Sequence, residues 1–183
     1  MHKIRSATFA TALVASLAAL PHTIALADDK EMIDANTERA LTWIRSSGDD
    51  AATLLEKAAG VLVFPDIVEM GFGVGGEFGE GALVVDGETV SYHATAGTTF
   101  GMGEEAGYKA EVIFFITKEA LESFRSTHSV KVGEHVEVPV MTTTERGSYK
   151  QHKSKPMVGM VFSEDGVASH LVLDGDRITR IAR

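Results

Sequence analysis

Three Asp-Gly dipeptides, Asp86-Gly87, Asp165-Gly166 and Asp174-Gly175, each separate two segments that are rich in apolar residues. Asp-Gly favours the two-residue turn of a β-hairpin, because both turn residues of the common type need a positive φ. A chain with repeated signals of this kind reverses its direction through tight turns between neighbouring strands. We therefore expect most of residues 60–181 to form an antiparallel sheet.

The expected strands are short and closely spaced. They cover residues 60–64, where Pro65 stops the strand, a glycine-rich stretch from Gly71, and residues 82–85, 89–93, 111–116, 136–140, 157–162, 167–173 and 177–181. The strand over 136–140 is expected from alternating valines. The last three segments are expected to form a closing meander. Hairpin signals between neighbours favour antiparallel pairing throughout.

Apolar residues at helical spacing predict three helices. The first covers residues 28–46, the second carries Leu54 and Leu55 and ends at Gly60, and the third is a short internal helix over 117–126. Leu121 and Phe124 are expected to face inward. The predicted fold class is therefore α+β, with a mostly antiparallel, barrel-like sheet, N-terminal helices and one short internal helix.

The N-terminus has the pattern of a cleavable secretory signal peptide. Two basic residues precede an uncharged apolar stretch over residues 7–20, and Ala25-Leu26-Ala27 places small residues where a signal peptidase reads the chain. We expect cleavage before Asp28, which leaves residues 28–183 as a single domain. The apolar stretch is shorter than the roughly 20 residues that span a bilayer, so an uncleaved anchor is the less favoured alternative. The expected location is the periplasm or the outside of the cell.

The charge and the cysteine content exclude several classes of protein. The net charge is −9, and it becomes −11 when residues 1–27, which hold two basic and no acidic residues, are removed. An acidic protein repels nucleic acid, so nucleic acid is not an expected partner. The chain has no cysteine, which excludes disulfides, thiol catalysis, cysteine metal sites and a lipid anchor at the cleavage point.

Catalytic and cofactor motifs are weak or absent in the sequence. Residues 71–76 match the letters of a dinucleotide-binding fingerprint, but residues 77–81 form a poor helix and place two carboxylates where phosphates would bind. A glycine-rich strand explains these residues better. His93 and His170 are expected to be surface or core-edge residues, and no zinc-protease spacing, serine elbow or phosphate loop is present. We expect no enzyme, no cofactor and no metal, with an unrecognised hydrolase as a minor alternative.

A basic segment interrupts the acidic sequence between residues 142 and 156. Its cations are Arg146, Lys150, Lys153 and Lys155. The segment has no apolar periodicity, so a solvated loop explains it. The alternative is a local contact with an anion or a membrane surface, which the distant acidic residues do not prevent because screening limits the reach of charge to about 8–10 Å.

Several segments resemble a known family. Residues 59–65 read Ala-Gly-Val-Leu-Val-Phe-Pro, and residues 71–83 read Gly-Phe-Gly-Val-Gly-Gly-Glu-Phe-Gly-Glu-Gly-Ala-Leu. Together with Tyr92 and residues 94–101, 114–124 and 166–181, they resemble the SYLF family of lipid-binding domains, whose bacterial members take their name from a yeast actin-patch regulator. Residues 142–156 are more basic than the family pattern, and residues 166–170 are less apolar.

The resemblance implies a compact domain that associates with lipids. Eukaryotic members bind phosphoinositides and, in yeast, actin, neither of which an exported protein meets. What the resemblance implies for this chain is affinity for an apolar chain or a membrane surface. It therefore adds lipid to the classes of ligand that the sequence allows.

Two functions follow from these observations. The first is a non-enzymatic exported binding module for a lipid, another apolar ligand or a membrane surface. Its candidate apolar contacts are Phe72, Val74, Phe78, Phe100 and Met102, and its candidate head-group contacts are Arg146, Lys150, Lys153 and Lys155. The aromatic residues could instead form the domain core. The second function is an envelope protein-interaction or structural domain that has no small ligand and uses an exposed strand edge.

Overall fold

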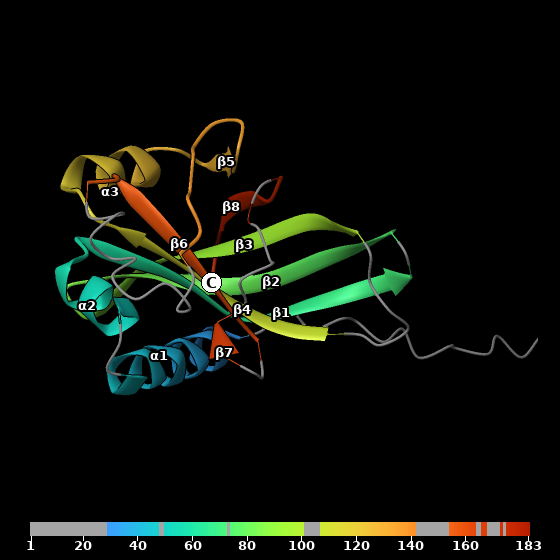
Figure 1. The fold of residues 1–183 in the computed structure, drawn as a ribbon, viewed down its shortest axis with the longest axis horizontal. Helices are drawn as coiled ribbons and strands as arrows, with labels where there is room; N and C mark the ends of the chain where they lie inside the picture. Colours follow the sequence, from blue (N-terminus) through green and yellow to red (C-terminus); the bar gives the residue numbers. More distant parts are fainter. Residues whose placement is uncertain are drawn as a thin grey trace, which may run out of the picture.

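The computed structural model shows an α+β fold built on one curled antiparallel sheet (Figure 1). The structure describes residues 29–47, 50–72, 74–100, 107–141, 154–163, 166–167, 173 and 175–183. Within these residues there are three helices and eight strands. The expected fold class is therefore confirmed.

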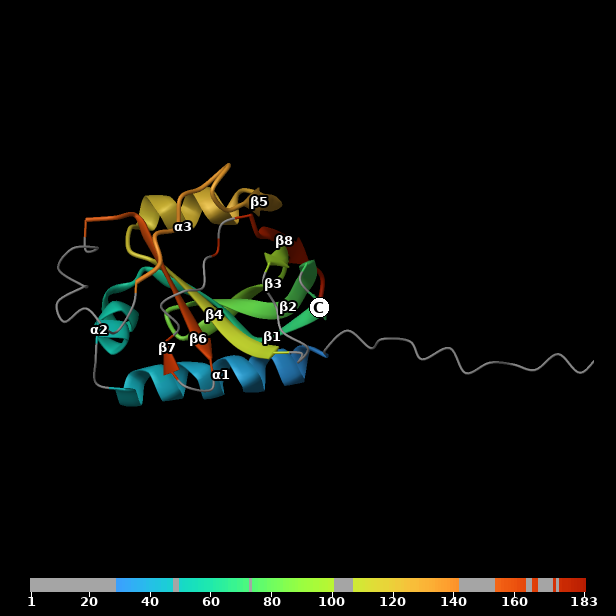
Figure 2. The ribbon, with the colours of Figure 1, turned by 45° about the vertical axis from the view of Figure 1, so that its right-hand side comes forward.

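Two helices at the N-terminus are followed by a long run of strands, which a third helix interrupts. The helices are α1 (Lys30–Ser47), α2 (Asp50–Lys57) and α3 (Lys118–Arg125). The strands are β1 (Gly60–Phe72), β2 (Val74–Val85), β3 (Glu88–Phe100), β4 (Gly107–Phe115), β5 (Ser129–Lys131), β6 (Met157–Ser163), β7 (Gly166–Val167) and β8 (Arg177–Ile181). Their order in the sheet is β5-β8-β3-β2-β1-β4-β6-β7. Figure 2 shows α1 along one face of the sheet and α3 with β5 over the other.

Alternate residues of β1 serve two cores, one on each face of the sheet. Leu62 and Phe64 pack in the core that includes Leu121 of α3. Val61 packs on the opposite face in the core that includes Leu41 of α1. Successive side chains of a strand point to opposite faces, so a nearly continuous apolar run is what a strand covered on both sides requires. The body of the domain is therefore a sheet between two helical layers.

The hairpin between β2 and β3 has the turn that its sequence predicts. Asp86 and Gly87 both have positive φ, 52° and 83°, as a type I′ turn requires. Both strands are longer than expected, because β2 begins at Val74 and β3 continues to Phe100. The glycine-rich stretch from residue 71 thus belongs to paired strands.

The expectation that Pro65 ends the first strand was wrong. β1 continues to Phe72, and its register with β2 shifts between Val63 and Asp66. A bulge at this point needs no ladder hydrogen bond from the proline, which has no N–H to donate. Similarly, α2 ends at Lys57, and Gly60 begins β1.

Two expectations about the C-terminal third were also wrong. Residues 136–140 contribute two isolated bridges, Val132 with Val136 and Val140 with Gly159, in place of a strand. The closing meander does not form, because β8 pairs with β3 and β5 at the other side of the sheet from β6 and β7. Residues 168–172 of the expected strand 167–173 lie outside the described residues.

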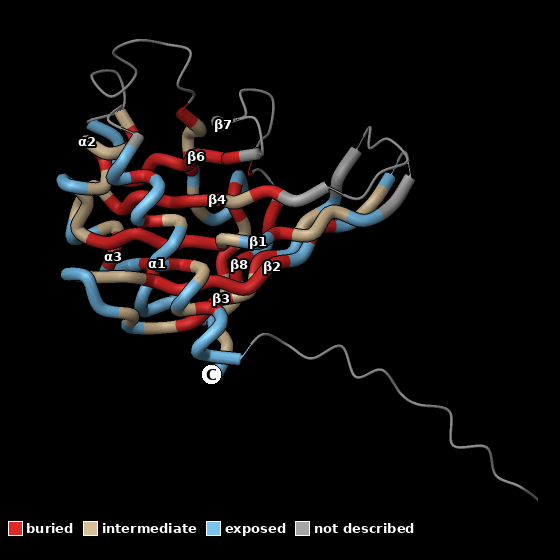
Figure 3. Tube along the Cα trace, turned by 90° about the horizontal axis from the view of Figure 1, so that it is seen from below, coloured by how far each residue is buried: buried red, intermediate tan, exposed pale blue. Residues whose placement is uncertain are grey.

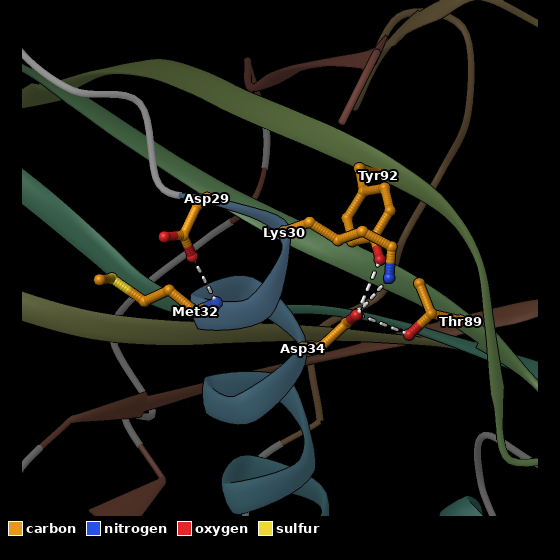
Figure 4. A network of polar contacts seen from close by, with 6 residues as sticks. All are labelled: Asp29, Lys30, Met32, Asp34, Thr89 and Tyr92. Atoms are coloured by element: carbon orange, nitrogen blue, oxygen red, sulfur yellow. Dashed lines mark hydrogen bonds and ion pairs between the residues drawn. The ribbon is translucent and has the colours of Figure 1, made fainter.

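A polar network fixes the beginning of α1 (Figure 4). Asp29 caps the helix by accepting a hydrogen bond of 2.9 Å from the backbone N–H of Met32. One turn later, the carboxylate of Asp34 accepts hydrogen bonds of 2.9 Å from the hydroxyls of Tyr92 and Thr89 on β3. α1 is thereby tied to the sheet. Among the described helices, none combines the length and the apolar character needed to cross a bilayer.

Candidate functional site

The ends of β1, β2 and β3 project beyond the helices, as the tube in Figure 3 shows. On the α1 face of β2, Ile33 of α1 covers Ala82. Farther along the same face, Phe78 and Val74 are exposed. The sheet thus leaves its helical cover before these strands end, which places side chains of the projecting strands in contact with solvent.

Three exposed apolar side chains lie together on this part of the sheet. Met70 is 61% exposed, Val74 is 63% exposed and Phe78 is 49% exposed. Met70 is paired with Gly76, which lies between Val74 and Phe78. Residues that face each other across an antiparallel ladder, and alternate residues along one strand, share a face. We call Met70, Val74 and Phe78 the apolar tip.

The apolar tip contains two of the residues predicted to contact lipid. The alternative that the aromatic residues belong to the core is wrong for Phe78, which is exposed. Phe72 and Phe100 lie in register with Val74, one on each neighbouring strand. The remaining predicted contacts Met102, Arg146, Lys150 and Lys153 lie outside the described residues.

Lys155 is exposed but lies at the other end of the sheet from the apolar tip. Lys155 precedes β6. The first residue of β6, Met157, pairs with the last residue of β4, Phe115. The first residue of β4, Gly107, pairs with Glu69 beside the tip. At about 3.3 Å per residue, the length of β4 separates the two ends by roughly 25 Å. The structure therefore does not bring Lys155 and the apolar tip into one patch.

The opposite face of the projecting strands holds buried charges. The ammonium of Lys109 lies 2.7 Å from Glu77 Oε2, 3.0 Å from Glu111 Oε1 and 3.5 Å from Glu69 Oε1. Asp176, just before β8, adds a fourth acid, because acid oxygens of Glu77, Glu111 and Asp176 lie within 4.8 Å of one another. Glu69, whose side chain is 18% exposed, is the member nearest to solvent. We call these five residues the charge cluster.

Burial shifts the pKa values of the charge cluster. Burial, with the nearby carboxylates of Glu111 and Glu77, raises the pKa of Asp176 to about 9. Burial also raises the pKa of Glu111 to about 7, although Lys109 opposes the shift. Burial acts to lower the pKa of Lys109, but the carboxylates of Glu111 and Glu77 outweigh it and hold that pKa above its usual value. One permanent cation thus faces four acids, and part of the cluster carries protons at neutral pH.

Gly97 on β3 provides the space in which two of these acids meet. It is paired with Glu77. A Cβ at this position would overlap Asp176 Oδ1 and lie 2.7 Å from Glu77 Oε1. Three acid oxygens this close could surround a cation, but the ammonium of Lys109 already forms ion pairs with Glu77 and Glu111. We therefore assign no metal to the cluster.

A second apolar feature lies beside α1. A groove of about 250 Å³ is lined by Ala40, Trp43, Ile44, Pro65, Lys109, Ala110, Val112 and Phe162. The half-exposed ring of Trp43 packs edge-on against Phe162, with 5.0 Å between the ring centroids. The volume is below the 300–1,000 Å³ of typical ligand pockets. The groove therefore suits a short apolar segment better than a whole lipid.

His93 is buried, which corrects the expectation of a surface or core-edge residue. Its ring packs against Phe124 at 5.0 Å between centroids, and its Nε2 lies 2.9 Å from Ser91 Oγ. Burial, with the nearby guanidinium of Arg180 and the imidazole of His128, lowers the pKa of His93 to about 4. The side chain is therefore neutral at physiological pH and serves the packing of α3.

The sequence reasoning missed the charge cluster. The available signal was the pair Lys109 and Glu111, which share one face of a strand that is otherwise apolar. The acids from other strands are far away in the sequence, so only the fold shows that they meet.

No protein-family model and no curated protein matches this chain. The resemblance to the SYLF family therefore stays a prediction based on the residues quoted above.

Proposed function

We propose that this protein is a non-enzymatic exported binding module whose apolar tip contacts a lipid or membrane surface. The observation that carries the proposal is the exposure of Met70, Val74 and Phe78 on one face of strands that extend beyond the helices. Clustered exposed apolar residues of this kind mark contact sites with membranes or partners. The resemblance to a lipid-binding family favours the membrane, and the signal-peptide pattern supports export.

The apolar tip supports weak binding when it acts alone. Complete burial of a Val, Met or Phe side chain is worth about 1.5–3 kcal/mol. Because about half of each side chain is already buried, the three together contribute roughly 2–5 kcal/mol. A free energy of about 4 kcal/mol corresponds to a Kd near 1 mM. Stable attachment thus needs several copies of the protein or a second contact, such as one made by Lys155 at the far end of the sheet.

One observation favours the second candidate, an envelope protein-interaction domain. β8 covers the edge of β3 only from Tyr92 to Ala96. Beyond it, residues 97–100 of β3 pair with β2 on one side and have no ladder partner on the other side among the described residues. An open edge of this kind can accept a strand from another protein. It lies at the projecting end, next to the apolar tip.

Flotation with liposomes of phosphatidylethanolamine and phosphatidylglycerol, at low and high salt, tests the proposal with residues 28–183. We expect flotation that persists at high salt and falls several-fold in the double variant Val74→Ser, Phe78→Ser. Val90→Ser is the matched control, because Val90 is an exposed valine on β3 away from the tip. Lys155→Glu should affect only the part of binding that salt weakens.

Other outcomes decide between the candidates. Absence of flotation at both salt concentrations, or equal loss in the tip and control variants, contradicts the lipid proposal. Association of the protein without lipid, blocked by Thr99→Pro at the open edge, would favour the second candidate, because proline cannot donate to a strand ladder.

A further inference from the structure

We propose that the charge cluster is a proton-dependent latch that holds the start of β8 against the projecting strands. Its members come from four places in the fold: Glu69 on β1, Glu77 on β2, Lys109 and Glu111 on β4, and Asp176 before β8. A contact among these residues therefore joins the C-terminal strand to the three strands that lie across the sheet.

Asp176 connects the cluster to the C-terminal elements through its backbone. Its carbonyl accepts a hydrogen bond of 2.9 Å from the N–H of Val132, just after β5, and its N–H donates to the carbonyl of Leu173 at 3.2 Å. β8 follows directly and pairs with both β3 and β5. A movement of Asp176 away from Glu77 therefore moves β5 and β8 with it.

The side chain of Asp176 has no cation of its own. Lys109 forms ion pairs with Glu69, Glu77 and Glu111, and no described ion pair includes Asp176. Asp176 is 4% exposed, and its Oδ2 lacks a hydrogen-bond partner among the described residues. An ionised carboxylate that is buried without a partner is costly, whereas a protonated one is neutral and can donate to Glu77. A proton between the two acids completes the contact.

The charges around Asp176 determine the direction of the effect. Glu77 and Glu111 face it and favour the protonated form, and Lys109 opposes them. Glu69 acts on Glu111 from β1. On β6, the residue paired with Glu111 is the apolar Val161. The neighbouring elements thus supply three carboxyl groups and one ammonium, so loss of the proton leaves adjacent negative charges in a dry site.

The sign of the pH dependence follows from linkage. The pKa of Asp176 is about 9 in the folded protein and 3.8 in a model compound, so the folded state holds a proton that the unfolded state has lost at neutral pH. Because unfolding releases this proton, the unfolding equilibrium constant rises by up to tenfold for each unit of pH. Opening of the latch therefore becomes more favourable as the pH rises from about 4 towards 9, and levels off above that pH.

Hydrogen exchange of the protein between pH 6 and 9.5, corrected for intrinsic exchange, tests the latch. We expect the protection of β8 and β5 amides to fall at least tenfold between pH 7 and 9.5, while β1 and β2 amides of the body change less. Asp176→Asn should abolish the fall, because asparagine keeps the shape and donates to Glu77 at any pH. Glu122→Gln, a change of an exposed acid on α3, is the control and should retain the fall.

Three results would overturn the proposal. The first is equal pH dependence in the wild type and in Asp176→Asn. The second is a uniform loss of protection over all strands, which indicates global unfolding in place of a latch. The third is a change in β8 protection at pH 7 on adding CaCl₂, MgCl₂ or EDTA, because a metal ion would then close the cluster. If Asp176→Asn does not fold, Glu77→Gln removes one of the two carboxylates that repel Asp176, and the fall should become smaller. No lipid is present, so the result is independent of the proposed function.

Discussion

The projecting strands and the body of the sheet differ in which kinds of residue they bury and expose. In the body, both faces of β1 are apolar and covered by helices. On the projecting strands, the exposed face carries Val74 and Phe78, whereas the buried face carries Glu77 and Lys109. Apolar groups in water and charges in the interior both oppose stability. The proposed contact surface and the proposed latch therefore lie on opposite faces of the same end of the molecule.

The largest effect is expected from removing the cation of the charge cluster. Lys109→Met leaves buried carboxylates without a partner, and we expect the free energy of unfolding to fall by about 3–5 kcal/mol at pH 7. Lys131→Met is the control, because Lys131 forms an exposed pair with Glu134 at 2.9 Å and should cost no more than about 1 kcal/mol. Urea titration measures both. Similar losses in the two variants would remove the distinction between the buried face and the surface.

The next largest effect on stability is expected from filling the space at Gly97. Gly97→Ala places a Cβ against Asp176 and Glu77, and we expect a loss of about 1–3 kcal/mol, as in other overpacked sites. Gly76→Ala is the matched control on the opposite face, where the nearest atom to the added Cβ is 3.7 Å away. A loss at Gly76 as large as that at Gly97 would show that glycine is needed on both faces.

At acid pH, His93 is expected to control the pH dependence of stability in the way that Asp176 does at alkaline pH. Its pKa is about 4 when folded and 6.5 in a model compound, so the unfolded state binds a proton first as the pH falls. Its contribution to stability is therefore lost between pH 6.5 and 4, opposite in sign to that of Asp176. Between pH 7 and 5, we expect the free energy of unfolding of His93→Gln to fall by about 1–2 kcal/mol less than that of the wild type. Denaturant titrations at both pH values measure this, and equal losses would contradict it.

The smallest effect is expected at the apolar tip. Phe78→Ser should lower the free energy of unfolding by about 1 kcal/mol, because only about half of the side chain is buried. Phe64→Ala, at a fully buried residue of the body, should cost about 3–5 kcal/mol. Thermal and urea unfolding measure the pair. A large loss for Phe78→Ser would mean that the tip is packed in solution.

Local chemistry made part of this structure predictable. The turn at Asp86 and Gly87 formed as expected because its conformation is specified by two residues. α3 begins after Thr117, whose hydroxyl accepts from the N–H of Ala120 at 3.2 Å, and such a cap is visible in the sequence. Val74 and Phe78 share one face of β2 as alternate residues of a strand. The sequence could not show that this face meets solvent, since that depends on where α1 ends its cover.

Long-range pairing was not predictable from the sequence. Pro65 was expected to end a strand, but neighbours on both sides of β1 carry the strand through a bulge. The turn signal at Asp174-Gly175 indicated a hairpin with the preceding strand, yet β8 pairs with β3. The charge cluster was missed for the same reason, because Glu77, Lys109 and Asp176 meet only when three distant segments are in place. The ligand chemistry of the apolar tip stays a prediction.

The position of β8 has a consequence for how the chain folds. Tyr92 of β3 pairs with Ile181, almost at the end of the sequence. During synthesis, β3 therefore has no neighbour on that side until residues 177–181 have emerged, and closing so long a loop slows folding. A chain that stops before β8 would carry a long unpaired edge, and such edges promote aggregation. The pairing of β8 with β3 thus helps to keep a newly made molecule separate from its copies.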